Sequence, residues 1–137
     1  MLHPAVVAEL LEQEAAVARE AHGRRFASLE VVGTDVVCHI TGTDKGDVLL
    51  RLDGSRYDAE PLGVTVVSPD GVVAPAQLWP GSLHHSDHPT LRRPWSCTRG
   101  CFEYHQFPGH SNEPWDVYRH EIRLVDLLDH LLRKAGK

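Results

Sequence analysis

Residues 29–67 read LEVVGTDVVCHITGTDKGDVLLRLDGSRYDAEPLGVTVV, and this stretch decides the fold. It holds four short runs rich in β-branched and aliphatic residues, separated by turns that contain glycine, aspartate and threonine. The runs are Leu29–Val32, Asp35–Ile40, Asp47–Leu52 and Leu62–Val67. The connections between them are shorter than the roughly a dozen residues that a parallel crossover needs. The stretch therefore predicts a four-stranded antiparallel meander.

An amphipathic helix is predicted on each side of these strands. Pro4 suits the first turn of a helix, apolar residues then recur at threes and fours, and Gly23 is placed to end it. The second helix is predicted to open near Glu113-Pro114. Its apolar face consists of Trp115, Tyr118, Ile122, Val125, Leu128 and Leu132. Two helices that cover one side of an antiparallel sheet make an α+β domain.

Length and charge restrict the class of protein. A chain of 137 residues fits one domain, residues 1–137, and the formal charge of -5 with scattered lysine and arginine argues against nucleic acid or anionic membrane as the main partner. No apolar run approaches the roughly 18 residues that span a bilayer. We therefore expect a cytoplasmic protein, in which the cysteines are free, catalytic or metal-bound rather than paired as disulfides.

The candidate functional segment lies between the strands and the second helix. From His84 to His110 the chain holds five of its ten histidines and two of its three cysteines. Thiolate and imidazole are ligands that zinc prefers, and a thiol beside imidazoles is also how a nucleophilic cysteine is made. The third cysteine, Cys38, falls inside a predicted strand and is expected to be a small buried apolar residue.

A metal site is one hypothesis for this segment. Cys97, Cys101, His105 and His110 follow the spacing C-x3-C-x3-H-x4-H and supply four nitrogen and sulfur ligands for tetrahedral zinc. With all four bound the site would be closed and structural, whereas three ligands and a water would permit hydrolytic chemistry. A thiolate held by zinc is a poor free nucleophile, so the metal and catalytic hypotheses compete for Cys97.

The loop before Cys97 is rich in glycine, proline and histidine. His84, His85 and His88 could add metal ligands, but histidines in a loop of this composition are expected to be solvated. Trp79 and Trp95 flank these histidines and are expected to pin the loop to the core, the alternative being that they line a groove for a partner.

Four short motifs stand at the junctions between the predicted elements. Residues 57–62 read Tyr-Asp-Ala-Glu-Pro-Leu before the fourth strand, and His88-Pro89-Thr90 precedes Cys97, which follows nine residues after His88. Residues 113–116 read Glu-Pro-Trp-Asp and lead into the second helix. In this order the parts resemble the ubiquitin-conjugating enzyme (UBC) fold, bacterial members of that superfamily in particular. The family has a tyrosine-proline corner, a histidine-proline-asparagine flap, a cysteine and a tryptophan turn at these places.

The resemblance implies a carrier of a ubiquitin-like modifier. Cys97 would accept the modifier's carboxyl terminus from its activating enzyme as a thioester and release it to an amine. His88 would belong to the flap, and Asp116 would orient or deprotonate the amine. Thr90 replaces the flap asparagine that stabilises the oxyanion and lacks its reach, so transfer to lysine is expected to be slow.

Two further expectations accompany this hypothesis. Arg93, Arg99 or an imidazole such as His105 is expected to favour the Cys97 thiolate. The chain also departs from the family pattern, because it carries a longer loop before the flap and an insertion over residues 101–112. Two alternatives therefore stay open: a non-catalytic UBC-like binding module stiffened by zinc, and a small metal-dependent hydrolase.

Overall fold

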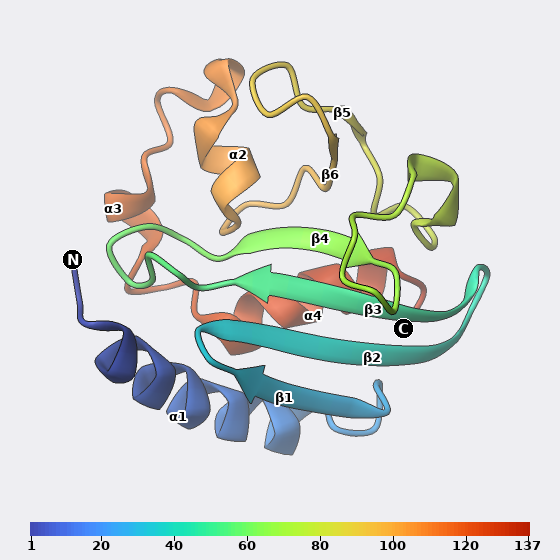
Figure 1. Ribbon diagram of the computed structural model, residues 1–137. Helices are drawn as coiled ribbons and strands as arrows, with labels where there is room; N and C mark the ends of the chain where they lie inside the picture. Colours follow the sequence, from blue (N-terminus) through green and yellow to red (C-terminus); the bar gives the residue numbers. More distant parts are fainter.

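The computed structural model describes residues 1–137 and is an α+β structure (Figure 1). An N-terminal helix is followed by a four-stranded antiparallel sheet, a long connecting segment and a C-terminal helix, as the sequence predicts. The main elements are α1 (Pro4–His22), β1 (Ser28–Val32), β2 (Asp35–Thr43), β3 (Gly46–Asp53), β4 (Gly63–Val67) and α4 (Leu124–Lys134). The strands pair in sequence order, β1-β2-β3-β4, so the predicted meander is confirmed.

Alternation along the strands builds the inner face of the sheet. In β2, Val36, Cys38 and Ile40 are fully buried, and the residues between them are only partly covered. Cys38 is therefore a buried core residue, as expected from its place in a strand. The β2–β3 hairpin is longer than predicted, because Thr43 pairs with Gly46 beyond an irregularity that follows Ile40.

Helices α1 and α4 pack against each other and cover the same face of the sheet (Figure 1). From α1 the buried residues are Val7, Leu11, Ala15 and Ala18, which lie one helical turn apart. From α4 they are Leu124, Leu127, Leu128, Leu131 and Leu132. These residues and the inner face of the sheet form one hydrophobic core. No helix is long and apolar enough to cross a membrane.

The prediction of the second helix is wrong in one respect, because the chain forms two separate helices after Pro114. A short helix, α3 (Trp115–Tyr118), ends before α4 begins at Leu124. The backbone of Arg123 is extended, and its N–H donates to Asp126 Oδ2 at 2.9 Å, which caps α4. Ile122 and Val125, placed on the apolar face by a continuous helix, are only half-buried as a result.

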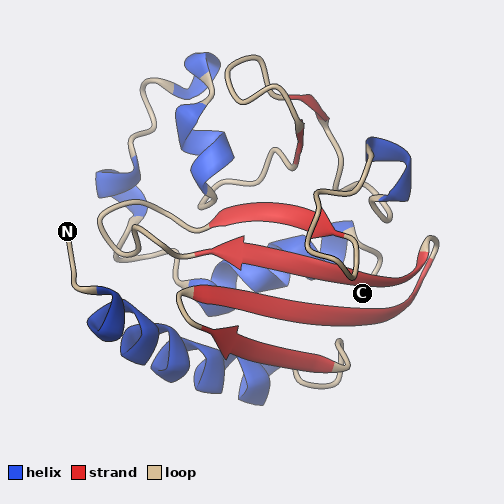
Figure 2. Cartoon of the chain, in the orientation of Figure 1, coloured by secondary structure: helices blue, strands red, loops and turns tan.

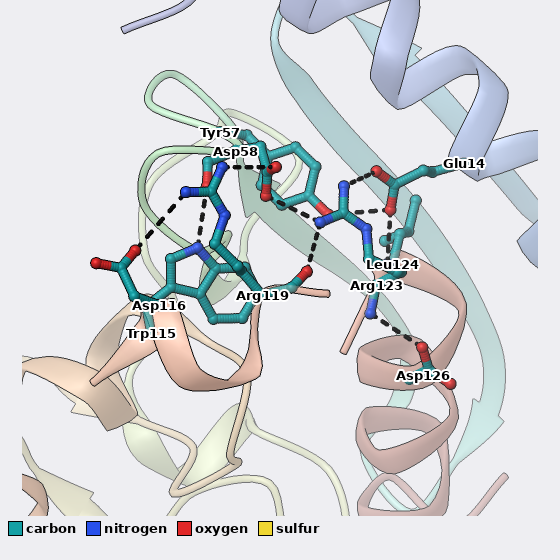
Figure 3. Close-up of polar contacts among 9 residues, drawn as sticks. All are labelled: Glu14, Tyr57, Asp58, Trp115, Asp116, Arg119, Arg123, Leu124 and Asp126. Carbon is teal, nitrogen blue, oxygen red and sulfur yellow. Dashed lines mark hydrogen bonds and ion pairs between the residues drawn. The ribbon is translucent and has the colours of Figure 1, made fainter. Parts of the chain in front are cut away.

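A network of charged groups lies where the chain turns between α3 and α4 (Figure 3). Arg123 donates to Glu14 on α1 at 2.5 Å and to Asp58 in the loop before β4 at 2.9 Å. Arg119 donates to Asp58 at 3.1 Å, and the buried Tyr57 hydroxyl donates to Glu14 at 2.9 Å. These bonds tie three separate parts of the chain together, namely α1, the loop before β4 and the junction between α3 and α4.

The segment between β4 and α3 folds over the edge of the sheet at β4 (Figure 2). Its elements are η1 (Ala76–Leu78), β5 (Ser86–Asp87), β6 (Pro94–Trp95), α2 (Phe102–Gln106) and η2 (Pro108–His110). Such short elements carry too few residues to show a periodic pattern, and the sequence indicates only a loop. Trp79 and Trp95 are 2% and 1% exposed, which confirms that they pin the segment to the core.

Candidate nucleophile site

Cys97 follows β6 and is the only cysteine with an accessible side chain. Cys38 and Cys101 are fully buried, whereas Cys97 is half-buried. Burial raises the pKa of the Cys38 thiol to about 12 and also raises the pKa of the Cys101 thiol. Cys101 is buried because its backbone forms a bridge with Leu62, next to β4. Chemistry at a thiol of this chain therefore belongs to Cys97.

An imidazole faces this thiol. His110 Nε2 lies 3.8 Å from Cys97 Sγ, within hydrogen-bond reach for sulfur. On the other side of the ring, His110 Nδ1 lies 3.0 Å from Glu113 Oε2. Because a carboxylate only accepts, Nδ1 carries the proton in the neutral imidazole, and Nε2 then presents its lone pair to the thiol. Thiol, imidazole and carboxylate thus stand in series, the arrangement of a nucleophile, its base and the group that orients the base.

Glu113 is held by several donors besides His110. Arg99 donates to it at 2.6 Å and the Tyr104 hydroxyl at 2.9 Å. The Tyr104 hydrogen bond, with Arg99 and His110, holds the pKa of the Glu113 carboxyl below its usual range. Tyr104 also stacks on the His110 ring, with ring centres 3.9 Å apart. The carboxylate is therefore ionised, and the orientation of the His110 ring is fixed from two directions.

Lys134 approaches Cys97 from the last turn of α4. Its Nζ donates to the Cys97 carbonyl at 2.7 Å and to Thr98 Oγ1 at 2.8 Å. Burial raises the pKa of the Cys97 thiol, Lys134 opposes this effect, and Glu113 adds to it. The thiol is therefore protonated at neutral pH, and its reaction as a nucleophile needs a base such as His110.

The groups expected to favour the thiolate are engaged elsewhere. Arg93 pairs with the buried Glu103, and Arg99 pairs with Glu113. His105 lies in the last turn of α2 and bonds to backbone groups. The expectation that these residues lower the thiol pKa is wrong, and the cation that does so is Lys134.

The four residues of the zinc hypothesis are not gathered around one point. Cys101 donates its thiol to the Ser96 carbonyl at 3.6 Å inside the core. Both ring nitrogens of His105 are occupied, since Nδ1 donates to the Glu113 carbonyl at 2.6 Å and Nε2 accepts from the Gly100 N–H at 3.2 Å. Nowhere are three Cys, His, Asp or Glu side chains arranged to hold a metal. In this arrangement the residues do not fit a tetrahedral zinc ion.

His88 organises the turn that the resemblance likens to a flap. It is 1% exposed, so the expectation that it is solvated is wrong. Its Nδ1 accepts from the N–H groups of Thr90 and Leu91 at 3.2 and 3.1 Å, and its Nε2 donates to the Glu103 carbonyl at 2.9 Å. Thr90 is exposed, and its hydroxyl makes no hydrogen bond within the protein.

Asp116 lies in the first turn of α3, where its side chain is 82% exposed and 3.7 Å from Arg119 (Figure 3). That position suits a partner of the helix dipole, and no contact joins Asp116 to Cys97.

Sequence reasoning missed Glu113 and Lys134 as site residues. The spacing of Glu113 three residues after His110 was a visible signal, whereas nothing local connects positions 97 and 134.

A polar hollow of about 260 Å³ lies away from Cys97, between β3, β4 and α2. Its three arginines are paired, because Arg51 binds Asp35, Arg56 binds Glu60, and Arg93 binds Glu103. The hollow therefore offers no unpaired positive charge to a ligand. We place the candidate site at Cys97, where a nucleophile has a base within reach.

The assignment of a function to Cys97 rests on this geometry and on the order of the elements. Comparison with known proteins finds no matching family model and no matching curated sequence.

Proposed function

We propose that the protein carries an acyl group as a thioester on Cys97, in the manner of a ubiquitin-conjugating enzyme. The acyl group would be the carboxyl terminus of a ubiquitin-like modifier, supplied by an activating enzyme. The observation that carries the proposal is the series in which Cys97 Sγ lies 3.8 Å from His110 Nε2 and His110 Nδ1 lies 3.0 Å from Glu113. The modifier itself is proposed from the resemblance, and the order of helix, meander, cysteine segment and helix agrees with it.

The acylation step follows from the protonated thiol. His110 Nε2 takes the thiol proton as Cys97 Sγ attacks the carbonyl carbon of the activated acyl group. A sulfur–carbon bond forms, the bond to the leaving group breaks, and the leaving group receives the proton from His110. Glu113 stabilises the imidazolium that exists between these two transfers.

Charge develops on the carbonyl oxygen during this step. The backbone N–H groups of Cys97 and Arg99 have no acceptor within the protein. They are candidate donors to the oxyanion, and donors of this kind supply much of the rate in acyl transfer. The free hydroxyl of Thr90 would be a third donor if the flap closes on a bound acyl group.

A second candidate function is a cysteine hydrolase, and the observation that favours it is the same imidazole. Once Cys97 is acylated, His110 Nε2 is free to take a proton from water, which would attack the thioester and regenerate the thiol. The two functions differ in the lifetime of the thioester, which a carrier must preserve and a hydrolase must destroy.

The test uses 4-nitrophenyl acetate, an activated ester that needs no partner protein. A carrier should release one 4-nitrophenolate per chain in a burst and retain an acetyl group on Cys97 that dithiothreitol removes. A hydrolase should continue to release 4-nitrophenolate after the burst. Cys97→Ala should abolish the burst, whereas Cys38→Ala should leave it unchanged because Cys38 is buried. Absence from native protein of any 4-nitrophenolate release that depends on Cys97 would overturn both functions.

Charging by a modifier tests the finer part of the proposal. With a ubiquitin-like modifier, its activating enzyme and ATP, native protein should form a band that dithiothreitol reverses, and Cys97→Ser should form a more stable oxyester. If the protein reacts with the ester but with no modifier encoded nearby, the proposed acyl chemistry stands and the proposal that it carries a modifier is overturned.

A further inference from the structure

We infer that Lys134 is an acceptor of the acyl group that Cys97 carries, so that the protein acylates itself on the last turn of α4. The inference rests on the proposed thioester and adds a second covalent site, an amide on a specific lysine. It follows from the position of the Lys134 amine.

The amine is held against Cys97 itself. Lys134 Nζ donates to the Cys97 carbonyl at 2.7 Å and to Thr98 Oγ1 at 2.8 Å. The Lys134 amine and the Cys97 thiol are also close enough for each to shift the pKa of the other, so the amine is held beside the residue whose sulfur would carry the acyl group. Both partners already occupy one site, which removes the entropy cost of bringing them together.

The helix that carries Lys134 is fixed. Leu131, Leu132 and Ala135 around it are buried, and the Ser82 N–H donates to the Lys134 carbonyl at 2.7 Å. The side chain therefore reaches Cys97 from an anchored backbone. No carboxylate pairs with Lys134, so reaction of the amine breaks no ion pair.

No other lysine has this position. The chain has two more, Lys45 and Lys137. Lys45 is exposed at the tip of the β2–β3 hairpin, and Lys137 is the exposed last residue, whose carbonyl accepts from Arg25. Neither makes a hydrogen bond to Cys97. They are internal controls, because direct reaction with an acyl donor would reach the exposed lysines more easily than the half-buried Lys134.

The acyl group passes from the Cys97 sulfur to the Lys134 nitrogen by aminolysis of the thioester. Lys134 loses one proton to water or His110, and its nitrogen attacks the carbonyl carbon of the thioester. A nitrogen–carbon bond forms, the sulfur–carbon bond breaks, and the sulfur leaves as a thiolate that takes up a proton. The amide nitrogen loses its remaining extra proton to solvent, and the products are a free thiol and an uncharged amide. No oxidant or further reactant is needed.

The product changes the site. An amide at Lys134 has no positive charge and fewer hydrogens to donate, so the contacts with the Cys97 carbonyl and Thr98 are weakened. Cys97 then lacks the cation beside its sulfur. Self-acylation would therefore slow the next charging of the same chain and limit its activity.

The experiment maps acetyl groups by mass spectrometry after the full-length protein reacts with 4-nitrophenyl acetate. Dithiothreitol removes thioesters and leaves amides. In native protein we expect the Lys134 amide to form at least about tenfold faster than amides at Lys45 or Lys137, because intramolecular reactions have high effective molarities. In Cys97→Ala this advantage should disappear.

Two variants separate the amine from its structural contacts. Lys134→Arg keeps a positive charge and hydrogen-bond donors but accepts no acyl group at this ester's reactivity, so its Cys97 thioester should outlast that of native protein. Lys137→Arg is the matched control and should behave as native protein does. If Lys134→Arg fails to fold, the amide map of native protein and Cys97→Ala still decides the question.

The outcomes distinguish this inference from the proposed function. A Cys97 thioester without faster amide formation at Lys134 overturns the inference and leaves the proposed function standing. No thioester at Cys97 overturns both. Mixing Cys97→Ala with Lys134→Arg tests transfer between chains: amide on the Cys97→Ala chain at the native rate would overturn transfer within one chain.

Discussion

Two clusters of charged side chains, one around Asp58 and one around Cys97, use similar groups to different effect. In the first, Arg119 and Arg123 both pair with Asp58, Arg123 also pairs with Glu14, and these bonds join α1 to the loop before β4 and to the start of α4. In the second, Glu113 is also crowded with donors, but the series continues through His110 to a thiol that is half-exposed. The difference is that only the second cluster ends in a nucleophilic atom, the sulfur of the half-buried Cys97. Ion pairs alone therefore indicate a structural role. A nucleophile at the end of a series of hydrogen-bonded groups indicates a catalytic role.

The largest effect on the Cys97 cluster is expected from replacement of His110. His110→Ala should lower the rate of Cys97 acylation by about 10²–10⁴, because a protonated thiol loses its base. The burst of 4-nitrophenolate measures this rate. His85→Ala is the matched control, since His85 is exposed and its ring contacts only Trp95 by an edge. Equal bursts from the two variants would remove His110 from the mechanism.

Substitutions in the Asp58 cluster should lower the free energy of unfolding without changing the rate of Cys97 acylation. Arg123→Met should lower the free energy of unfolding by about 2 kcal/mol, less than for a fully buried pair, because the Arg123 and Glu14 side chains are 26% and 13% exposed. Urea denaturation measures the change. Arg133→Met, which removes an exposed pair with Asp129, should cost a few tenths of a kcal/mol. A similar loss from both variants would contradict the role of the network.

A smaller effect is expected from a conservative substitution of Glu113 in the Cys97 cluster. Glu113→Gln should slow acylation by roughly tenfold, because the imidazole remains but its orientation and its charged form lose support. The amide oxygen can still accept from Tyr104 and Arg99, so the melting temperature should fall by only a few degrees. An unchanged burst with an altered melting temperature would place Glu113 among the structural acids.

The pH dependence of alkylation tests the charge balance at Cys97. The pKa of this thiol is raised, so the thiolate fraction is small at neutral pH and grows as pH rises. The rate of reaction with iodoacetamide should therefore rise to higher pH than that of N-acetylcysteine before it levels off. Lys134→Met removes the opposing cation and should slow alkylation a few-fold at fixed pH, whereas Lys134→Arg should not. Levelling at lower pH than in the free thiol would contradict this account.

The smallest expected effect concerns metal. Because Cys101 lies in the core and both nitrogens of His105 are occupied, chelation with EDTA should leave the melting temperature unchanged. Elemental analysis of purified protein should find zinc well below one equivalent. Stoichiometric zinc that is lost together with stability in the Cys101→Ser/His105→Ala variant would restore the closed zinc site and require this segment to rearrange.

Much of the fold could be predicted because its elements show their periodicity locally. The helix that begins at Pro4, the four strands, the burial of Cys38 and the pinning tryptophans all follow from patterns within a few residues of each position. The break between α3 and α4 could not be predicted, since the apolar spacing continues across it. At the break, Arg119 and Arg123 pair with Asp58, which lies far from both in the sequence.

Some features of the candidate site are also visible in the sequence, whereas others depend on how distant parts of the chain pack. Local spacing in the sequence shows that Cys97 lies in a segment dense with histidines and that Glu113 follows three residues after His110. Only the tertiary structure decided that His110 faces the thiol, that Cys101 is buried beside β4, and that Lys134 returns to Cys97 from the far end of the chain. The physical reason is that local spacing reports which residues share a face of an element. Contacts between positions far apart in the chain depend on how the elements pack, and here that is set by α4 lying against the sheet and α1.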